Sequence, residues 1–239
     1  MYSRFLFLLV SIACLPLAAQ AQSANPCADL ASLKIDSVEI TKTTLVPDGT
    51  VIPPPFPWMP KVGPLPEHCL VDGVMHRRKG AGGEEFGIGF ELALPMKAAW
   101  NGDLVMQGGG GSNGFVFYPT GASYAGDTPA LVRGFAVAST DTGHKAKTGA
   151  FDFSFMRDQQ AFLDFAFLAN AEVAGVAKRI IAQYYAKPAS YSYFVGCSTG
   201  GREGMISPSV IPRCLMASCL ATRRCVRGCQ ILPSENGFP

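Results

Sequence analysis

The sequence YFVGCSTGGREG, residues 193–204, decides the predicted fold of this 239-residue chain. The run from Tyr191 to Val195 is rich in aromatic and β-branched residues, which is typical of a buried strand. Small residues then turn the chain sharply, and Gly196 to Gly200 matches G-x-S-x-G, the motif of a serine held at a tight strand-to-helix turn. In such a turn the hydroxyl of Ser198 is exposed above the sheet, and the N–H of Thr199 points at a developing oxyanion.

A second glycine cluster, Gly108 to Gly111, lies upstream and follows another short apolar run. A serine hydrolase with this motif needs such a loop to supply a second oxyanion N–H. A phosphate-binding loop is the alternative, but it would continue into G-K-[ST], whereas residues 112–114 read SNG. The pattern therefore favours ester hydrolysis, with an N–H of Gly109, Gly110 or Gly111 as the second donor.

Several segments, in this order along the chain, resemble the tannase and feruloyl esterase family of α/β hydrolases, from about Cys27 to Met205. They are Leu94–Pro95, Trp100–Gly102, Gln107–Gly111, Ser139–His144 and the serine motif with Cys197 directly before Ser198. The resemblance implies an α/β fold, with a mixed sheet that carries the serine turn. It also implies hydrolysis of phenolic acid esters, such as galloyl, feruloyl or terephthalate half-esters, through a serine acyl-enzyme.

The resemblance has two further implications for the site. A cysteine in the position of Cys197 is bonded, in the family, to a cysteine beside the downstream catalytic histidine. Substrate choice and a structural calcium belong to a lid insertion, for which this chain has no counterpart, so we expect no cofactor and no metal here.

Residues 1–21 are predicted to be a signal peptide, with Arg4, an apolar stretch from Phe5 to Leu17 and the cleavage pattern Ala19-Gln20-Ala21. The apolar stretch is short for a membrane span. We therefore expect a secreted or periplasmic protein with no membrane contact after cleavage. The hydrophobic content of 48% suits a globular protein, and the net charge of +2 argues against a nucleic-acid partner. The expected partner is a small aromatic ester.

Export permits disulfide bonds, and Cys27 and Cys69 are the only cysteines between the cleavage site and the serine motif. We predict that they pair, and two buried free thiols are the alternative. Cys197 then has no partner among the first 205 residues. The bridge that the family resemblance implies for it needs a suitable cysteine downstream.

Hydrophobic periodicity predicts several strands and one long helix. Strands are expected within residues 33–46, 69–76, 86–95, 104–107, 131–139 and 191–195. Apolar residues recur at helical spacing from Asp158 to Ala186, and Pro188 ends that helix. Strand, helix and strand then form a right-handed βαβ crossover that leads into the serine turn. The proline-rich residues 51–60 are expected to be a surface loop that joins no ladder.

Asp141 and His144 follow the predicted strand 131–139 and could be read as part of a catalytic triad. In α/β hydrolases, however, the acid and then the histidine follow the serine in chain order. We therefore expect these two residues to shape the pocket rather than to act as a catalytic pair.

The character of the chain changes after Ile206. Residues 207–239 hold four cysteines and four arginines but one acid, Glu235. The cysteine spacing, with gaps of four, five and three residues between Cys214 and Cys229, matches no zinc pattern. We interpret this tail as the product of a shifted reading frame, because another frame from about Pro208 is compatible with segments RYP and FDGIV like those that follow the serine in the family. Gene sequence across the codons for residues 206–209 tests this.

The predicted organisation is thus a signal peptide (1–21), a partial α/β-hydrolase catalytic domain (22–206) and an aberrant tail that is unstructured or frameshifted (207–239). Such a chain lacks the lid, the later strands and the catalytic aspartate and histidine of the family. We expect little or no esterase activity from it, because a serine without a base is a poor nucleophile. Two other interpretations stay open: another secreted α/β hydrolase, either a lipase or a peptidase, and a non-enzymatic module built on the tail cysteines.

Overall fold

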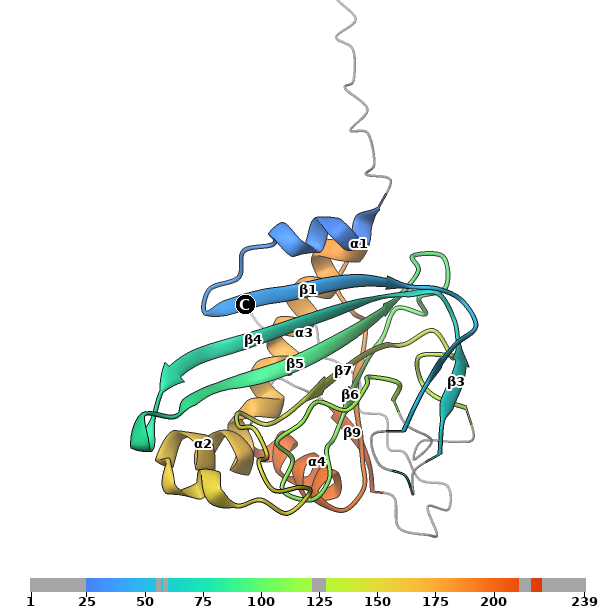
Figure 1. Cartoon of the computed structure of the whole chain (residues 1–239). Helices are drawn as coiled ribbons and strands as arrows, with labels where there is room; N and C mark the ends of the chain where they lie inside the picture. Colours follow the sequence, from blue (N-terminus) through green and yellow to red (C-terminus); the bar gives the residue numbers. More distant parts are fainter. Residues whose placement is uncertain (1–24, 55–56, 58–59, 122–127, 211–215, 221–239) are drawn as a thin grey trace, which may run out of the picture.

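The computed structural model places the serine motif at the end of a strand in a mixed sheet (Figure 1). The structure describes residues 25–54, 57, 60–121, 128–210 and 216–220. The predicted signal peptide and most of the tail lie outside these residues. Within them, no helix combines the length and the apolar character that a membrane crossing requires.

Within the described residues, the main sheet has seven strands in the order β1-β4-β5-β7-β6-β8-β9. The strands are β1 (Val38–Val46), β4 (His68–Lys79), β5 (Glu85–Pro95), β6 (Leu104–Gln107), β7 (Ala136–Thr140), β8 (Ser192–Gly196) and β9 (Met216–Leu220). Strands β1, β4 and β5 form an antiparallel meander, and β5 also pairs antiparallel with β7. From β7 onward the neighbours β7, β6, β8 and β9 are parallel.

The parallel strands are the most deeply buried part of the sheet. Every residue of β6 and β7 is buried, which explains their continuous apolar sequences, because parallel strands are covered on both faces. In β5 exposed or half-buried positions still interrupt the buried ones. The carboxyl ends of β6, β7 and β8 lie at one edge of the sheet, where open α/β sheets place their ligands.

The predicted helix from Asp158 to Ala186 is confirmed, with one local irregularity. It consists of α2 (Gln159–Leu163), a π-helical turn η5 (Asp164–Leu168) and α3 (Ala169–Tyr185). The carboxylate of Asp158 caps the first turn by accepting the N–H of Ala161 at 2.8 Å. Ala186 closes the helix in the left-handed conformation. The helix links β7 to β8 and so forms the expected βαβ unit.

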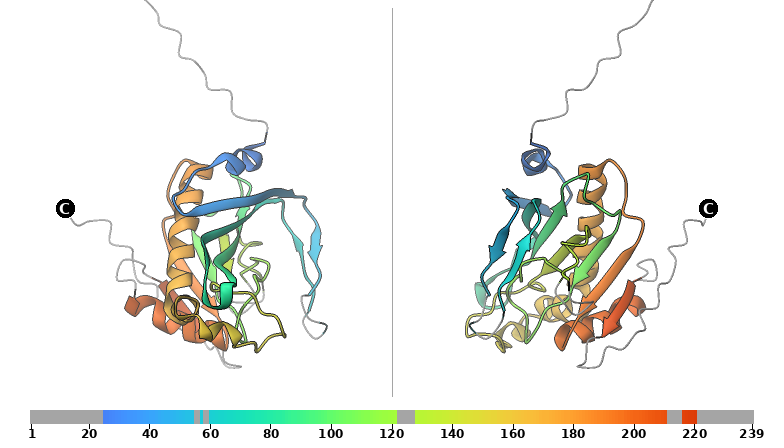
Figure 2. Two further views of the ribbon diagram at one scale, coloured as in Figure 1. Left: turned by 60° about the vertical axis from the view of Figure 1, so that its left-hand side comes forward. Right: turned by 90° about the vertical axis from the view of Figure 1, so that its right-hand side faces the viewer.

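Helix α3 covers one face of the sheet, and the small sheet of β2 (Thr50–Ile52) and β3 (Val62–Leu65) lies on the other side (Figure 2). The apolar face of α3, with Val173, Ile180 and Ile181 fully buried, packs in one core with Leu92 and Phe194 of the sheet. The shorter helical elements are α1 (Pro26–Asp29), η1 (Leu30–Ser32), η2 (Ala81–Gly83), η4 (Ser154–Arg157) and α4 (Thr199–Val210).

Two expectations about local structure are wrong. Strand β2 includes Val51 and Ile52 and pairs with β3, whereas residues 51–60 were expected to join no ladder. The prolines begin at residue 53, so the N–H groups of Val51 and Ile52 remain available for pairing. The strand expected from residue 131 begins only at Ala136, because residues 130–134 form a turn that Gly134 closes with a φ of 84°.

The predicted disulfide between Cys27 and Cys69 is confirmed, with a Cα–Cα distance of 5.5 Å. It ties the short helix α1 to β4, and both cysteines are almost fully buried. Cys197 is a half-buried free cysteine.

The predicted domain boundary at residue 206 falls inside α4, which extends to Val210. Beyond it, β9 pairs in parallel with β8 over five residues, from Met216 opposite Ser192 to Leu220 opposite Gly196. Residues 216–220 of the expected unstructured tail thus extend the sheet. The tail cysteines Cys214, Cys225 and Cys229 lie outside the described residues.

Candidate active site

The serine turn joins β8 to α4 within two residues. Ser198 stands between Gly196, the last residue of β8, and Thr199, the first of α4, and its φ is 56°. Non-glycine residues in this left-handed region cost about 1–3 kcal/mol and cluster at functional sites. The residue is exposed, although its neighbours Gly196 and Gly200 are buried. The turn therefore presents one hydroxyl to solvent on a strained and well-packed support.

Glycines on both sides of the serine allow β8, α4 and the polyglycine loop to approach one another. A Cβ on Gly196 would lie 2.5 Å from the carbonyl carbon of Gly200, and one on Gly108 would lie 2.7 Å from the Cα of Gly200. The N–H of Gly200 donates to the carbonyl of Gly109 at 3.1 Å. The packing of backbone against backbone leaves no room for side chains here.

We predict that Gly196→Ala lowers the free energy of unfolding by about 1–3 kcal/mol, since the new methyl group meets backbone that has no flexible end to move. Urea unfolding of the purified chain measures this. The matched control is Gly175→Ala in α3, where an added Cβ meets nothing within 4 Å. That change is expected to be neutral or to stabilise by up to about 1 kcal/mol. An equal, small effect of both substitutions would contradict the packing argument.

The polyglycine loop lies directly against the serine turn. The hydroxyl of Thr199 donates to the carbonyl of Gly111 at 2.5 Å. The N–H of Gly109 is already used, because it donates to Oε2 of Glu203 at 3.1 Å. No described residue accepts a hydrogen bond from the N–H of Gly110, Gly111 or Thr199. Of the predicted oxyanion donors, these three remain available and Gly109 does not.

Glu203 is a residue that the sequence analysis did not single out. It lies in α4, and only 3% of its surface is exposed. Its Oε1 accepts a hydrogen bond from Nδ2 of Asn113 at 2.6 Å, and the same Nδ2 donates to Oγ1 of Thr142 at 3.1 Å. Burial raises the pKa of Glu203, and the N–H groups of Asn113 and Gly109 oppose that shift. The sequence signal that could have identified Glu203 was an acid five positions after the serine, in a helix that packs on the sheet.

Asp141 and His144 do not form a pair. The buried carboxylate of Asp141 accepts the N–H groups of Gly89 and Gly143, each at 2.9 Å, and the Nζ of Lys145 at 2.6 Å. The His144 ring is stacked on Phe155 with 3.6 Å between the ring centroids. Burial lowers the pKa of His144 to about 4, so the ring is neutral at physiological pH. Both residues therefore act in the packing of the loop after β7.

All three histidines of the chain lie within the described residues, and none makes a hydrogen bond to Ser198. His68 is buried and donates from Nδ1 to the carbonyl of Pro66 while Nε2 accepts from the hydroxyl of Tyr118, both at 2.6 Å. His76 is exposed and lies 3.7 Å from Glu172. None of the three histidines therefore lies in the hydrogen-bonded position of a general base for Ser198.

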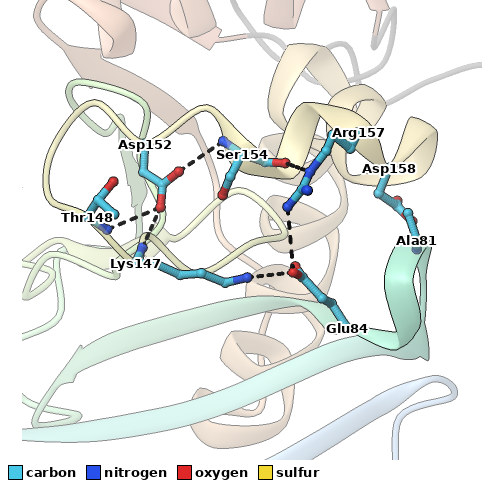
Figure 3. Close-up of polar contacts among 8 residues, drawn as sticks. All are labelled: Ala81, Glu84, Lys147, Thr148, Asp152, Ser154, Arg157 and Asp158. Atoms are coloured by element: carbon cyan, nitrogen blue, oxygen red, sulfur yellow. Dashed lines mark hydrogen bonds and ion pairs between the residues drawn. The ribbon is translucent and has the colours of Figure 1, made fainter.

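A loop after β7 supports the polyglycine loop from outside. Asp152 accepts the N–H groups of Lys147 at 2.6 Å, Thr148 at 3.2 Å and Ser154 at 2.9 Å (Figure 3), and these donors lower its pKa. The folded loop presents the carbonyl of Ala150, which accepts the N–H of Ser112 at 2.7 Å and its hydroxyl at 3.2 Å.

Ion pairs fasten the same loop to the start of β5. The Nζ of Lys147 lies 2.7 Å from Glu84, and Arg157 lies 3.8 Å from the same carboxylate (Figure 3). A cavity of about 200 Å³ lies here, lined by residues 84–86, Lys145, Lys147, Ser154 and Phe155. Its lining does not include Ser198, so it is separate from the serine turn. Among the described residues no cluster of His, Cys, Asp and Glu could hold a metal ion.

The chain is similar to known proteins in sequence and in structure. Mono(2-hydroxyethyl) terephthalate hydrolase of Piscinibacter sakaiensis is 39% identical over 154 residues, which cover 62% of this chain and 25% of that protein. A protein of Arthroderma benhamiae named "Probable feruloyl esterase" is 30% identical over 218 residues, which cover 86% of this chain and 38% of that protein. The crystal structure of feruloyl esterase B from Aspergillus oryzae superimposes with a TM-score of 0.60 at 27% identity, covering 75% of this chain and 33% of that one.

The chain thus spans between a quarter and two fifths of the length of these relatives. A family model described as tannase and feruloyl esterase matches residues 69–213, more than half of the chain, and the match includes both glycine segments and the serine turn. The mixed sheet, the βαβ unit and the strand-to-helix turn agree with the α/β-hydrolase type of these structural neighbours. The chain belongs to the tannase and feruloyl esterase family of ester hydrolases.

Proposed function

We propose that this chain carries the nucleophile and the oxyanion site of a serine carboxylic-ester hydrolase. The observation that carries the proposal is the position of Ser198, exposed and left-handed at the β8–α4 turn, next to a loop with unused N–H groups. The contact between Thr199 Oγ1 and Gly111 O holds that loop against the turn. This arrangement brings a serine hydroxyl and N–H groups to one edge of the sheet, which supports the proposal.

In the proposed reaction the Oγ of Ser198 attacks the ester carbonyl and forms a tetrahedral intermediate. The negative oxygen accepts hydrogen bonds from the N–H of Thr199 and from that of Gly110 or Gly111. The carbon–oxygen bond to the alcohol then breaks, which leaves an acyl-enzyme that water hydrolyses to the acid and free Ser198. The proton of the serine must pass to a base, and then to the departing alcohol.

We propose aromatic and phenolic acid esters as the substrate class, since the named relatives are a terephthalate ester hydrolase and feruloyl esterases. We also propose that the protein acts outside the cytoplasm, in the periplasm or after secretion. The disulfide between Cys27 and Cys69 supports this, because such bonds form and persist in oxidising compartments.

The missing base limits the activity of this chain by itself. With no histidine hydrogen-bonded to Ser198, we expect hydrolysis no faster than about 10³–10⁴-fold above the uncatalysed rate, the level that an oxyanion hole and substrate binding leave when a triad member is removed. Full activity then requires a general base, for which the family resemblance implies an acid and a histidine downstream of the serine.

Imidazole can test this proposal by acting as a base from solution. Purified chain is mixed with methyl ferulate or with the corresponding amide, with and without imidazole, and release of ferulic acid is followed against protein-free controls. We expect protein-dependent, imidazole-stimulated hydrolysis of the ester alone. Cleavage of the amide would favour a peptidase instead. Rapid ester turnover without imidazole would show that the chain contains its own base, and it would contradict the expected upper limit on the rate.

A further inference from the structure

We propose that Glu203 is a positioning residue that clamps the oxyanion loop to the helix following the nucleophile. The inference rests on the proposed function, because it assigns a role to Glu203 in the oxyanion site of Ser198. It concerns the residues that orient the N–H groups. These residues are distinct from the groups that would contact the substrate.

Helix α4 holds both polar backbone groups of Gly109. The N–H of Gly109 donates to Oε2 of Glu203 at 3.1 Å, and its carbonyl accepts the N–H of Gly200 at 3.1 Å. The orientation of this peptide segment is therefore set by the helix that also carries the serine turn. A side chain on Gly109 would collide with Oδ1 of Asn113, so the close approach requires glycine.

The other end of the loop is held by the same carboxylate. Nδ2 of Asn113 donates to Oε1 of Glu203 at 2.6 Å, and the carbonyl of Gly110 accepts the N–H of Asn113 at 2.9 Å. One buried side chain thus binds the loop before and after Gly110 and Gly111. The N–H groups of these two glycines are the ones left without an acceptor among the described residues, and the clamp determines where they point.

The chemistry of this position calls for a carboxylate. Three groups donate to Glu203: the N–H of Gly109, the side chain of Asn113 and that of Asn170. A carboxylate accepts from all of them, whereas an amide of the same shape brings its own N–H groups and must face at least one donor with another donor. Glu203→Gln therefore keeps the volume of the side chain but breaks part of the clamp.

Arg202 supplies the compensating charge without taking part in the clamp. Its Nη2 lies 3.8 Å from Oε1 of Glu203, and its guanidinium donates to the carbonyls of Phe165 and Ala166 at 3.0 Å and 2.7 Å. Its cation also lies 4.5 Å from the ring centroid of Phe165. The arginine is thus fastened to the π-helical turn, and among the described residues Glu203 is the charged anchor of the loop.

Phenylboronic acid tests the clamp, because the oxygen of a serine hydroxyl bonds to its trigonal boron and the proton passes to the buffer, which leaves a tetrahedral anion in the oxyanion site. The adduct needs no turnover and is detected by ¹¹B NMR with the 239-residue chain. We expect Glu203→Gln to weaken the adduct about tenfold or more, since displaced donors lose contact with the charged oxygen. The matched control is Glu172→Gln, an exposed glutamate of α3, which should bind as the wild type does.

Circular dichroism and urea unfolding show whether the substituted chain is folded. If Glu203→Gln does not fold, Asn113→Ala can be used instead. It removes one end of the clamp and is also expected to lower the affinity for phenylboronic acid. A folded Glu203→Gln or Asn113→Ala variant with unchanged adduct affinity would overturn the inference.

Hydrogen exchange of the backbone amides tests the clamp independently of the proposed function. If the wild-type chain forms no tetrahedral adduct, the nucleophile assignment fails, and the clamp is then judged by the Gly109 amide. Loss of the Glu203 acceptor is expected to speed exchange of that amide at least about tenfold, because the N–H loses its charged partner. Equal exchange rates in wild type and Glu203→Gln would contradict the clamp in either case.

Discussion

Ser198→Ala is expected to abolish the protein-dependent hydrolysis of methyl ferulate and to remove the phenylboronic acid adduct entirely. The methyl side chain keeps the turn but offers no oxygen to attack a carbonyl or boron. The remaining N–H groups then have no covalent intermediate to stabilise. Imidazole-stimulated release of ferulic acid, measured with and without protein, gives the first result, and ¹¹B NMR gives the second.

Cys197→Ser is the matched control for this prediction. It changes the neighbouring residue of the same turn, removes the free thiol and leaves Ser198 in place. We expect it to retain both the hydrolysis and the adduct. Hydrolysis that persists in Ser198→Ala but disappears in Cys197→Ser would identify the thiol as the nucleophile and would reject the serine assignment.

Replacing Cys27 and Cys69 together by alanine is expected to lower the free energy of unfolding by about 4 kcal/mol. The disulfide closes a loop between residues 42 positions apart, and losing it restores conformational freedom to the unfolded chain. Such a loss is a large share of the 5–15 kcal/mol that typical domains have. Alanine is preferred to serine because both sites are buried and a hydroxyl there would need a hydrogen-bond partner. Urea unfolding of the purified variant provides the measurement.

Reduction of the wild-type chain provides an independent comparison. A reducing agent should lower the free energy of unfolding of the wild type to that of the double alanine variant and leave the variant unchanged. Cys197→Ala, which removes the thiol of Cys197 and leaves the disulfide in place, should have an effect within about 0.5 kcal/mol. A double variant as stable as the wild type would show that the bridge from α1 to β4 does not constrain the fold.

The features that the sequence predicted correctly depend on short-range patterns. The strand-to-helix turn around Ser198 needs only a β-branched run, small residues and a following helix, all within a dozen positions. The helix from Asp158 to Ala186 is encoded by its apolar period and by its capping residue, apart from the π-helical turn within it. The disulfide followed from there being only two cysteines between the cleavage site and the serine motif.

Local patterns failed where pairing between distant segments decides the structure. Val51 and Ile52 stand beside a proline run, yet they form β2 because β3 supplies a partner strand. Residues 216–220 belong to the tail that was expected to be unstructured or frameshifted, and they extend the sheet because β8 leaves an edge with unpaired backbone groups. In both cases the sequence around the strand carries no information about the partner.

By itself, the sequence determined the residue types of the proposed site: a serine at a tight turn, glycines that allow close approach, and backbone donors. Only the tertiary structure decided which donors are free. Glu203 lies 94 residues from Gly109 along the chain, and their hydrogen bond withdraws one predicted donor while it holds the others in place. The physical reason is that a buried acceptor selects its donors by proximity in three dimensions, whereas the serine turn depends on the backbone preferences of consecutive residues.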